Sequence, residues 1–430
     1  MALILGAAAM SLVALARSVA TLTVAAPLVA IVIGAYVAAH IVVRRTAPQA
    51  DPLLLPLAAI LNVIGLAAVY RIDVAEPDAA YGPAQVTWTV VGIVFFIGVL
   101  LAVKDHATLS RFKYIFGFAG VGLLIIPATP LGTEINGAQL WVRIGGLSFQ
   151  PGEIAKICLV IFFAAYLAER KELLAIASRR VLGFHVPDLK HFGPLLVMWG
   201  LSLAVMFYEK DLGSSLLFFS IFLVMLYIAT ARIVYVAFGM LLFMIGSYVG
   251  YTVFSHVQDR VLVWVDVFDP RYIQDEGYQL AQSLFALATG GLFGTGLGQG
   301  RPDIIPEVQT DFIFSAIGEE LGLLGTSAVL ICFMLMVARG LRIATNARSD
   351  FGQLLAAGMT TIFGIQTIII LAGVTRLLPL TGITLPFMSY GGSSLLSNFI
   401  LMALLVRISH QSASAPAPAQ TSEILVGGRR

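Results

Sequence analysis

The sequence predicts an all-α polytopic membrane protein, and three observations support this. Of the 430 residues, 59% are hydrophobic and only 12% are charged, whereas a soluble domain carries about 25% charged residues. The apolar residues form long runs separated by charged or Pro/Gly-rich segments. A helix needs roughly 20 such residues to cross the bilayer with its backbone groups bonded internally. The net charge of +2, without a basic tract, gives no indication of nucleic-acid binding.

Twelve apolar runs are predicted as spanning helices. The first is short and resembles the apolar part of a signal peptide. It lacks a basic segment before it, and further spans follow, so we interpret it as membrane structure. The fifth ends in Pro and Gly, so the expected count is ten to twelve. The runs are 2–16, 22–43, 53–70, 87–103, 112–129, 153–168, 192–208, 212–230, 233–252, 312–338, 352–375 and 384–406.

The basic residues give these spans a direction, because cytoplasmic connections carry an excess of Lys and Arg. One alternating set of connections holds 17 of the 26 basic residues, and the opposite set holds eight. We therefore expect the first set, and both termini if there are twelve spans, to be cytoplasmic. The first set is Arg44, Arg45, Lys104, Arg111, Lys113, Arg170, Lys171, Arg179, Arg180, Lys190, Arg232, Arg339, Arg342, Arg348, Arg407, Arg429 and Arg430. The second is Arg17, Arg71, Arg143, Lys210, Arg260, Arg271, Arg301 and Arg376.

This direction places the 130–152 loop, the 253–311 loop and the turn from Arg376 to Thr384 on the outer face. The 253–311 loop is the longest connection, and loops of this length are functional or disordered. Its aromatic residues, such as Trp264 and Tyr278, predict that it folds in part.

Three regions are expected along the chain. Residues 1–50 form extra N-terminal transmembrane segments, and residues 51–410 form the core. Residues 411–430 begin QSASAPAPAQ and have the composition of a disordered cytoplasmic tail.

Ionisable residues within or beside the spans are candidates for function, because they are costly in lipid. An equal alternative is that some of these residues form internal ion pairs that hold helices together. This applies to Glu153 with Lys156, and to Glu319 and Glu320, each with a basic partner. Asp311 is expected to be a helix N-cap, with Thr310 as the competitor. The full set is Glu153, Lys156, Glu209, Lys210, Asp211, Asp311, Glu319, Glu320 and Arg376.

Acidic residues also begin the long outer loop, in QDRVLVWVDVFDPRY. Asp269 precedes Pro270, and an Asp in that position is often only a turn residue. The neighbouring Trp264 and Phe268 favour partial desolvation, which would raise the pKa of a carboxyl group and suit a general base. A second motif, the glycine-rich TGGLFGTGLGQG at 289–300, lacks the strand that a dinucleotide site requires, so close backbone packing or a re-entrant turn is expected there.

Five linked motifs resemble the SEDS family of shape, elongation, division and sporulation proteins, which includes RodA, FtsW and SpoVE. The resemblance covers residues 53–408. The motifs are NGAQLWVRIGGLSFQPGEIAK (136–156), KDLGSSLLFF (210–219), GYQLAQSLFALATGGLFGTGLGQG (277–300), PEVQTDFIFSAIGEELGLLG (306–325) and LPLTGITLPFMSYGGSS (378–394).

The resemblance implies a ten-helix core with peptidoglycan glycosyltransferase activity. Its substrates would be lipid II and a growing glycan on undecaprenyl pyrophosphate, polymerised on the outer face of the bacterial cytoplasmic membrane. The implied partners are a class B penicillin-binding protein, which is a transpeptidase, and the elongation machinery. A lipid II flippase or transporter is the alternative, although no internal repeat supports it. A structural scaffold is a third possibility.

The resemblance also assigns residues. In WVDVFDPRYIQDEGYQ, Asp269 matches the essential loop carboxylate, with Asp266 as fallback, although an insert, RYIQDE, precedes Gly277. The residues expected to bind substrate are Trp141, Arg143, Lys156, Lys210, Asp211, Arg260, Asp266, Glu319, Arg376 and Ser389. Further matching positions are Asn136, Gly137, Gln150, Pro151, Glu153, Glu307, Asp311, Glu320, Pro386, Tyr390, Gly391, Gly392 and Ser393.

Basic residues are expected to stabilise the departing pyrophosphate. Arg143, Lys210, Arg260 and Arg376 are the available ones on the outer side. No cofactor is required, although a divalent cation, Mg²⁺ or Mn²⁺, could share this task. Thr381 replaces the Lys of many division-type members, which favours the elongation branch. The extra N-terminal spans resemble actinobacterial members.

Overall fold

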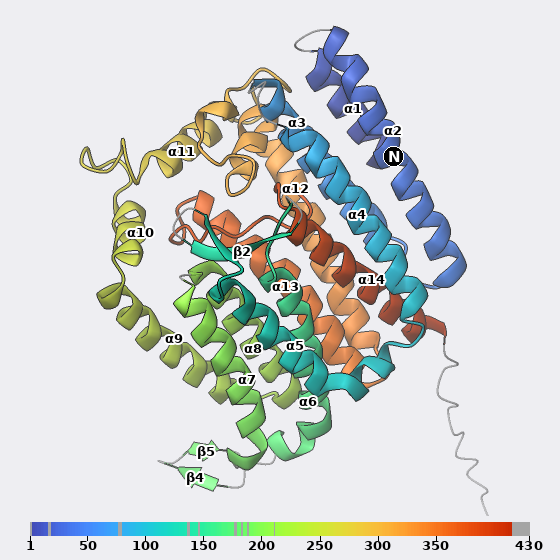
Figure 1. Cartoon of the computed structure of the whole chain (residues 1–430), viewed down its shortest axis with the longest axis vertical. Helices are drawn as coiled ribbons and strands as arrows, with labels where there is room; N and C mark the ends of the chain where they lie inside the picture. Colours follow the sequence, from blue (N-terminus) through green and yellow to red (C-terminus); the bar gives the residue numbers. More distant parts are fainter. Residues whose placement is uncertain are drawn as a thin grey trace, which may run out of the picture.

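In the computed structural model, helices fill nearly all the predicted spans. The structure describes residues 2–15, 19–75, 80–135, 138–144, 147–175, 179–181, 184–186, 189–209 and 211–414. The long helices are α1 (Ala2–Leu15), α2 (Val19–Thr46), α3 (Leu54–Ala75), α4 (Tyr81–Ala102), α5 (Lys113–Ile125), α6 (Gly152–Ala175), α7 (Leu189–Tyr208), α8 (Leu212–Thr230), α9 (Ile233–Val253), α12 (Ile313–Asn346), α13 (Asp350–Val374) and α14 (Gly392–Ser414). Figure 1 shows most of them running in roughly one direction through the molecule.

Among the described residues, nine helices are long and apolar enough to cross a membrane. The chain is therefore a multi-pass membrane protein. The first predicted span, 2–16, is only partly confirmed. Its helix α1 has 14 residues, which reach about 21 Å at 1.5 Å per residue and fall short of the hydrocarbon thickness.

The last predicted span, 384–406, was wrong at its start. Helix α14 begins only at Gly392, because the chain before it includes Pro386 and a positive φ of 63° at Phe387. At its other end α14 continues to Ser414, four residues into the predicted tail. The rest of that tail, 415–430, lies outside the described residues.

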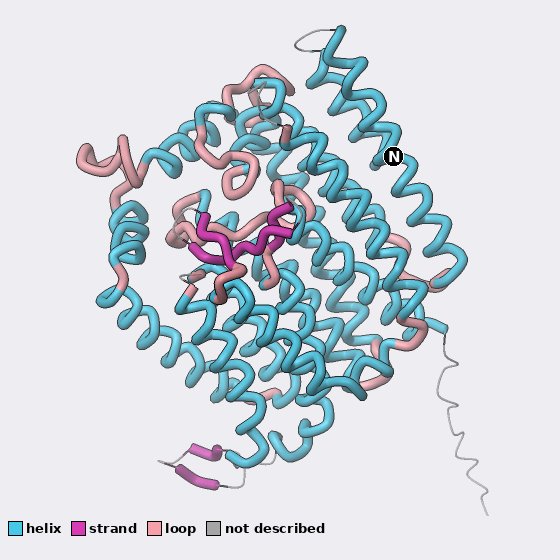
Figure 2. Tube along the Cα trace, in the orientation of Figure 1, coloured by secondary structure: helices cyan, strands magenta, loops and turns pink. Residues whose placement is uncertain are grey.

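The bundle has two ends. The loop end carries the outer features that the sequence predicts, and Figures 1 and 2 show its short sheet and helices on one side of the bundle. The 253–311 loop folds as predicted, into α10 (Ser255–Val265), α11 (Tyr278–Gly290) and the 3-10 turn η3 (Pro302–Ile304). The 130–152 loop follows η2 (Ile126–Ala128) and forms an antiparallel sheet of β1 (Gly132–Ile135), β2 (Ala138–Ile144) and β3 (Leu147–Phe149). The sequence analysis did not predict this sheet.

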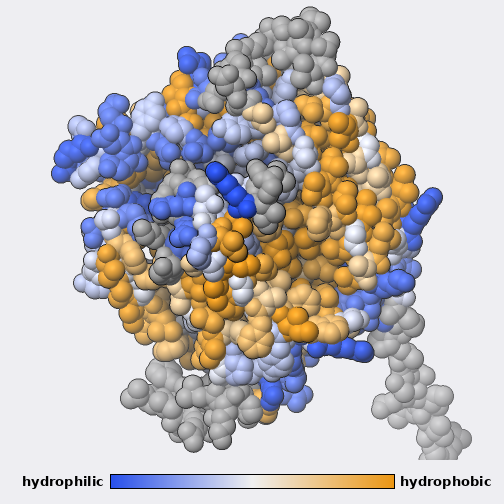
Figure 3. Space-filling model, viewed as in Figure 1, coloured by the Kyte–Doolittle hydropathy of each residue, from blue (hydrophilic) through white to orange (hydrophobic). Residues whose placement is uncertain are grey.

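The opposite end is the basic end, which carries most of the Lys and Arg residues. It includes η1 (His106–Phe112) and a two-stranded sheet of β4 (Arg179–Val181) and β5 (Phe184–Val186). Arg407 of α14 donates to the carbonyl oxygens of Thr46 (3.0 Å) and Leu100, so it ties the ends of α2 and α4 together. Figure 3 shows a broad apolar band on one face of the molecule, with hydrophilic residues towards both ends.

The glycine-rich segment packs by backbone contact, as predicted. It fits into a break in α12 at Gly322, where φ is 65° and ψ is −165°. The N–H groups of Thr295 and Gly296 donate to the carbonyl oxygens of Glu319 (2.9 Å) and Glu320 (3.0 Å). A Cβ at Gly294 would lie 2.2 Å from the oxygen of Glu320. Glycine is therefore required for this approach, and the segment fixes the loop-end turn of α12.

Candidate functional site

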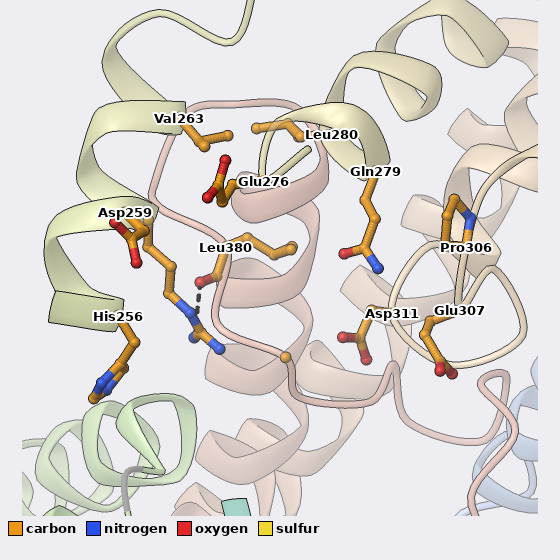
Figure 4. Close-up of a pocket in the computed structure, with 12 residues that line it drawn as sticks. His256, Asp259, Val263, Glu276, Gln279, Leu280, Pro306, Glu307, Asp311 and Leu380 are labelled. Carbon is orange, nitrogen blue, oxygen red and sulfur yellow. Dashed lines mark hydrogen bonds between the residues drawn. The ribbon is translucent and has the colours of Figure 1, made fainter. Parts of the chain in front are cut away.

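The loop end contains a polar cleft made of two adjoining cavities. The inner cavity, about 380 Å³, lies between α6, the start of α8, β2 and the start of α14. The outer cavity, about 490 Å³, lies between α10, α11 and the segment before α12. Both cavities are lined by Arg260, Glu307, Asp311 and Gly382. These residues therefore mark the junction of the polar cleft, and Figure 4 shows it from the outer cavity.

Arg260 is the cation at this junction. It comes from α10, the amphipathic helix of the outer loop, and its Nη1 donates to the carbonyl oxygen of Leu380 at 3.1 Å, the dashed line in Figure 4. Burial lowers the pKa of Arg260, and the charges of Asp311 and Asp211 partly offset this. Arg260 was predicted to bind substrate, and the structure brings it into the cleft.

Asp311 is the carboxyl group at the same junction. Burial and the neighbouring charge of Glu307 raise its pKa to about 7, while Arg260 and a hydrogen bond from Thr310 act in the opposite direction. A group with this pKa can take up or release a proton at neutral pH, as general acid–base catalysis requires. The predicted N-cap role was wrong: the N-cap position of α12 is Phe312, and no side chain caps it. Asp311 instead lies in the cleft (Figure 4).

Lys156 and Glu153 form the floor of the inner cavity. Their side chains pair at 2.6 Å, and the Lys156 side chain is only 2% exposed. Lys156 also lies 3.3 Å from Oε1 of Gln366, and Ser397 donates to Glu153 at 2.6 Å. The ion-pair alternative is therefore confirmed, and both residues still line the cleft. Sequence analysis missed Gln366, a polar residue in the middle of α13, although its place inside an apolar span was a signal.

Asp211 begins α8 at the edge of the inner cavity. Its carboxylate accepts from the backbone N–H of Ser214 at 2.9 Å, so it is the N-cap of α8 as well as a cleft residue. Burial is the main reason that its pKa is raised. The neighbouring Glu209 is buried, and this desolvation, together with the charge of Asp211, raises its pKa to about 8. Lys210, a predicted substrate-binding residue, lies outside the described residues.

Asp269, the predicted base, lies in the connection between α10 and α11 and lines neither cavity. Its carboxylate accepts from Arg271, at 2.9 Å from the backbone N–H and 3.1 Å from Nε. The hydrogen bonds from Arg271 lower the pKa of Asp269 to about 2. Asp266 is exposed, and its carboxylate accepts from the N–H of Phe268 at 3.2 Å. The pKa of Asp269 is therefore lowered and not raised, contrary to what its aromatic neighbours suggested.

Two of the other predicted substrate-binding residues lie on the sheet of β1, β2 and β3. Trp141, on β2, lines the inner cavity. Arg143, two positions further along the same strand, is exposed and does not line it. Asn136 and Gly137, which match the family motif, lie outside the described residues.

Three further predicted substrate-binding residues make structural contacts instead. Arg376, with φ of 61°, donates from Nε to the carbonyl oxygen of Trp264 at 2.9 Å and so holds the end of α10. The hydroxyl of Ser389 accepts from the N–H of Leu385 at 2.8 Å. Glu319 is buried and accepts from the N–H of Arg301 at 2.9 Å. None of the three lines the polar cleft.

Glu320, next to Glu319, pairs with Arg71 at 2.9 Å. The predicted alternative of an internal ion pair is confirmed for this residue. The pair also connects α3 with the loop-end part of α12, next to the glycine-rich segment.

The predicted divalent cation has no ligand cluster of its own among the described residues. Within the part of the chain that the structure describes, no group of three or more His, Cys, Asp or Glu side chains could hold a metal ion. A magnesium ion that is bound mainly by substrate phosphates needs only one or two carboxylates, so the involvement of Mg²⁺ or Mn²⁺ stays a prediction.

The bundle of apolar helices and the charged cleft at one end together define an integral membrane protein with a polar site at one end of its transmembrane bundle. The family described as "Cell cycle protein", FtsW/RodA/SpoVE, matches residues 52–414. The chain belongs to this family. It resembles its actinobacterial RodA members in particular, as the relatives below show.

The "Peptidoglycan glycosyltransferase RodA" of Mycobacterium leprae (strain TN) is 47% identical over 399 residues, which are 91% of this chain and 85% of the relative. The protein of the same name from Mycobacterium tuberculosis (strain ATCC 25618 / H37Rv) is 48% identical over 380 residues, or 86% of this chain and 80% of the relative. The extra N-terminal helix α2 therefore lies at least partly within the region shared with M. leprae.

Two solved structures share the fold. One, titled "Structural coordination of polymerization and crosslinking by a peptidoglycan synthase complex", matches with a TM-score of 0.68 and 24% identity and covers 85% of this chain and 99% of that chain. The rod shape determining protein RodA of Thermus thermophilus matches with a TM-score of 0.59 and 23% identity and covers 85% and 98%. At these identities, the likeness concerns the fold.

Proposed function

We propose that this chain, an enzyme of the peptidoglycan glycosyltransferase class, polymerises lipid II in the polar cleft for cell elongation and shape. The observation that carries this proposal is the junction of the cleft. There Arg260 lies with Asp311, a carboxyl group whose pKa is about 7, between two cavities. A polymerase needs room for two substrates whose reacting atoms meet, and a junction between two cavities meets that requirement.

The reaction joins two sugars and releases a lipid pyrophosphate. The 4-hydroxyl oxygen of the acceptor sugar attacks the anomeric carbon of the donor and forms a β-1,4 bond. The bond from that carbon to the pyrophosphate oxygen breaks, and undecaprenyl pyrophosphate leaves with the electron pair. The hydroxyl proton passes to a carboxylate. Arg260 stabilises the negative charge on the departing pyrophosphate, because it is the cation that lines both cavities among the described residues.

Two carboxylates are candidates for the base. Asp269 is the residue that the family motif indicates. In this conformation it could act only after its bonds to Arg271 break and the loop moves towards the junction. Asp311 already lines both cavities, and its pKa suits proton transfer at neutral pH. We therefore assign the base to Asp311 and treat Asp269 as the competing assignment.

The Lys/Arg bias supports an orientation in which the basic end is cytoplasmic and the polar cleft faces outward, in a bacterial cytoplasmic membrane. The lipid tails of both substrates would remain in the bilayer. We also propose a class B penicillin-binding protein as partner, because one structure of this fold is titled as a complex for polymerisation and crosslinking. That partner would cross-link the strands that this chain makes.

The test uses full-length protein in detergent with labelled lipid II, and glycan strands are separated on gels. We expect polymer from the wild type and a loss of roughly 10²- to 10⁴-fold in Asp311→Asn, the usual size of a general-base contribution. Asp269→Asn is measured in parallel, and a single cooperative thermal unfolding transition is the folding control for both variants. Full activity in Asp311→Asn would reject it as the base.

The same assay separates the enzyme from its rivals. A flippase only moves lipid II from one leaflet to the other, and detergent micelles have no leaflets, so a flippase would yield no polymer. A scaffold would likewise yield none, and its cellular role would tolerate loss of both carboxylates. Absence of polymer from the folded wild-type protein, alone or with its partner, would therefore reject the proposed function.

A further inference from the structure

A second cleft, the basic cleft, opens at the other end of the bundle. Its volume is about 850 Å³, and its walls are the α2–α3 connection, the end of α12 and the end of α14. Arg342 lies 29 residues along α12 from Ile313, which places this cleft roughly 40 Å from the start of that helix. We propose that the basic cleft binds the phosphate-bearing headgroup of an anionic lipid from the adjacent leaflet.

The charge of the basic cleft is positive. Arg339, Arg342 and Arg348 line it, and Asp51 is the single acidic residue among its lining residues. Arg339 pairs with Asp51 at 2.5 Å, so that acid is neutralised. Arg342 is exposed and makes no side-chain hydrogen bond or ion pair with any residue that the structure describes. It lies one turn beyond Arg339 on the same helix face, so its guanidinium is available to an anion.

The wall of the basic cleft is built before any ligand arrives. The N–H of Asp51 donates to the hydroxyl of Ser409 at 2.9 Å, and its carboxylate accepts from the N–H of Leu53 at 3.0 Å. The Asp51 side chain is only 7% exposed. These bonds fix the α2–α3 connection against α14, and Arg339 fixes α12 to the same connection. A guanidinium on such a frame can bind phosphate through two parallel hydrogen bonds.

The surroundings favour a lipid over a free anion. Exposed apolar side chains lie on the same part of α12 as the arginines, among them Met334 (62% exposed) and Leu341 (45% exposed). Leu53, which directly precedes α3, is 42% exposed. A ligand with a phosphate and acyl chains would contact both surfaces, and basic pockets between spanning helices on the cytoplasmic side bind such headgroups. The inference rests on the orientation given by the Lys/Arg bias and not on the chemistry at the polar cleft.

The test measures lipid binding by the full-length protein in detergent. Phosphatidylglycerol is titrated and its binding followed by native mass spectrometry and by the shift in Tm. Phosphatidylcholine with the same acyl chains and inorganic phosphate are the comparison ligands. Arg342→Gln is the variant, and Arg111→Gln is the matched control, because Arg111 is an exposed arginine of η1 at the same end but outside the cleft.

We expect phosphatidylglycerol to bind about tenfold more weakly to Arg342→Gln than to either the wild type or Arg111→Gln. A loss of this size is the effect of losing one charge-assisted hydrogen bond. Equal affinity in the two variants, or equal binding of phosphatidylcholine, would overturn the proposal. Binding of inorganic phosphate as tight as that of the lipid would show a free-anion site and overturn the proposal as well.

Should Arg342→Gln not fold, Arg342→Lys keeps the charge but loses the paired donors. A severalfold loss is expected there, and unchanged affinity would count against the lipid site.

Discussion

The pH dependence of polymerisation separates the two candidate bases. Asp311 has a pKa of about 7, whereas that of Asp269 is about 2. If Asp311 is the base, kcat/KM follows its ionised fraction, which rises from about 9% at pH 6 to about 91% at pH 8 for a pKa of 7. The rate should therefore rise about tenfold across this range. If Asp269 is the base, it is ionised above 99% throughout, and the carboxylate contributes no slope.

A variant of Arg260 tests the origin of this slope. The positive charge of Arg260 lowers the pKa of Asp311, so Arg260→Gln should move the rise in rate to higher pH as well as reduce the rate. The assay is the initial rate of lipid II polymerisation from pH 5.5 to 8.5, with the wild type and Asp269→Asn as references. A flat profile in the wild type would refute the assignment of Asp311, and so would an unshifted profile in Arg260→Gln.

The same group also makes a prediction for stability. The folded protein binds the Asp311 proton more tightly than the unfolded chain does, because the pKa is raised from 3.8 to about 7. This contribution is complete below pH 3.8 and is lost as the pH rises through 7. In the wild type, Tm should therefore fall between pH 5 and 8 by more than it does in Asp311→Asn.

Two further predictions concern packing. Gly322→Ala would place a Cβ 2.3 Å from the nitrogen of Gly294, at φ of 65°. It should lower the free energy of unfolding by about 1–3 kcal/mol from backbone strain and by a similar amount from overlap. Gly34→Ala, whose Cβ would have nothing within 4 Å, is the control, and equal thermal unfolding of the two variants would contradict the packing account. Lys156→Met leaves the Glu153 carboxylate, whose side chain is 13% exposed, without its cation and should lower the free energy of unfolding by about 3–5 kcal/mol. The double variant with Glu153→Gln should recover most of this loss, and an equally unstable double variant would show that the pair itself stabilises the fold.

The spans could be predicted because their signal is local. Runs such as 212–230 and 233–252 are apolar over the length that the bilayer requires, and the helices end within a residue of the predicted limits. Local backbone geometry could not be predicted in the same way. The start of α14 depends on the positive φ of Phe387, and the sheet of β1, β2 and β3 depends on pairing between short strands. Neither follows from hydropathy.

The site was predictable in its location and less so in its members. The charge bias placed the long loop and its acidic residues at one end, where the structure has the polar cleft. Arg260, Asp211, Lys156 and Trp141 lie in that cleft as expected. Asp311 was assigned to capping because it lies at the start of a helix in the sequence. Its neighbour Arg260 comes from a segment about fifty residues away, so only the tertiary structure reveals the pair.

Asp269 shows how a neighbouring side chain can change the meaning of a motif residue. The residues RYIQDE, which interrupt the resemblance just after Asp269, begin with Arg271. Arg271 is the residue that binds the Asp269 carboxylate and lowers its pKa to about 2. The segment RYIQDE therefore supplies the partner that makes Asp269 a weak base. Arg260 and Asp311 lie outside this segment, and the arrangement they form at the junction does not depend on it. On these physical grounds we propose Asp311 as the base, and Asp269 competes with it only where the loop opens and releases Asp269 from Arg271.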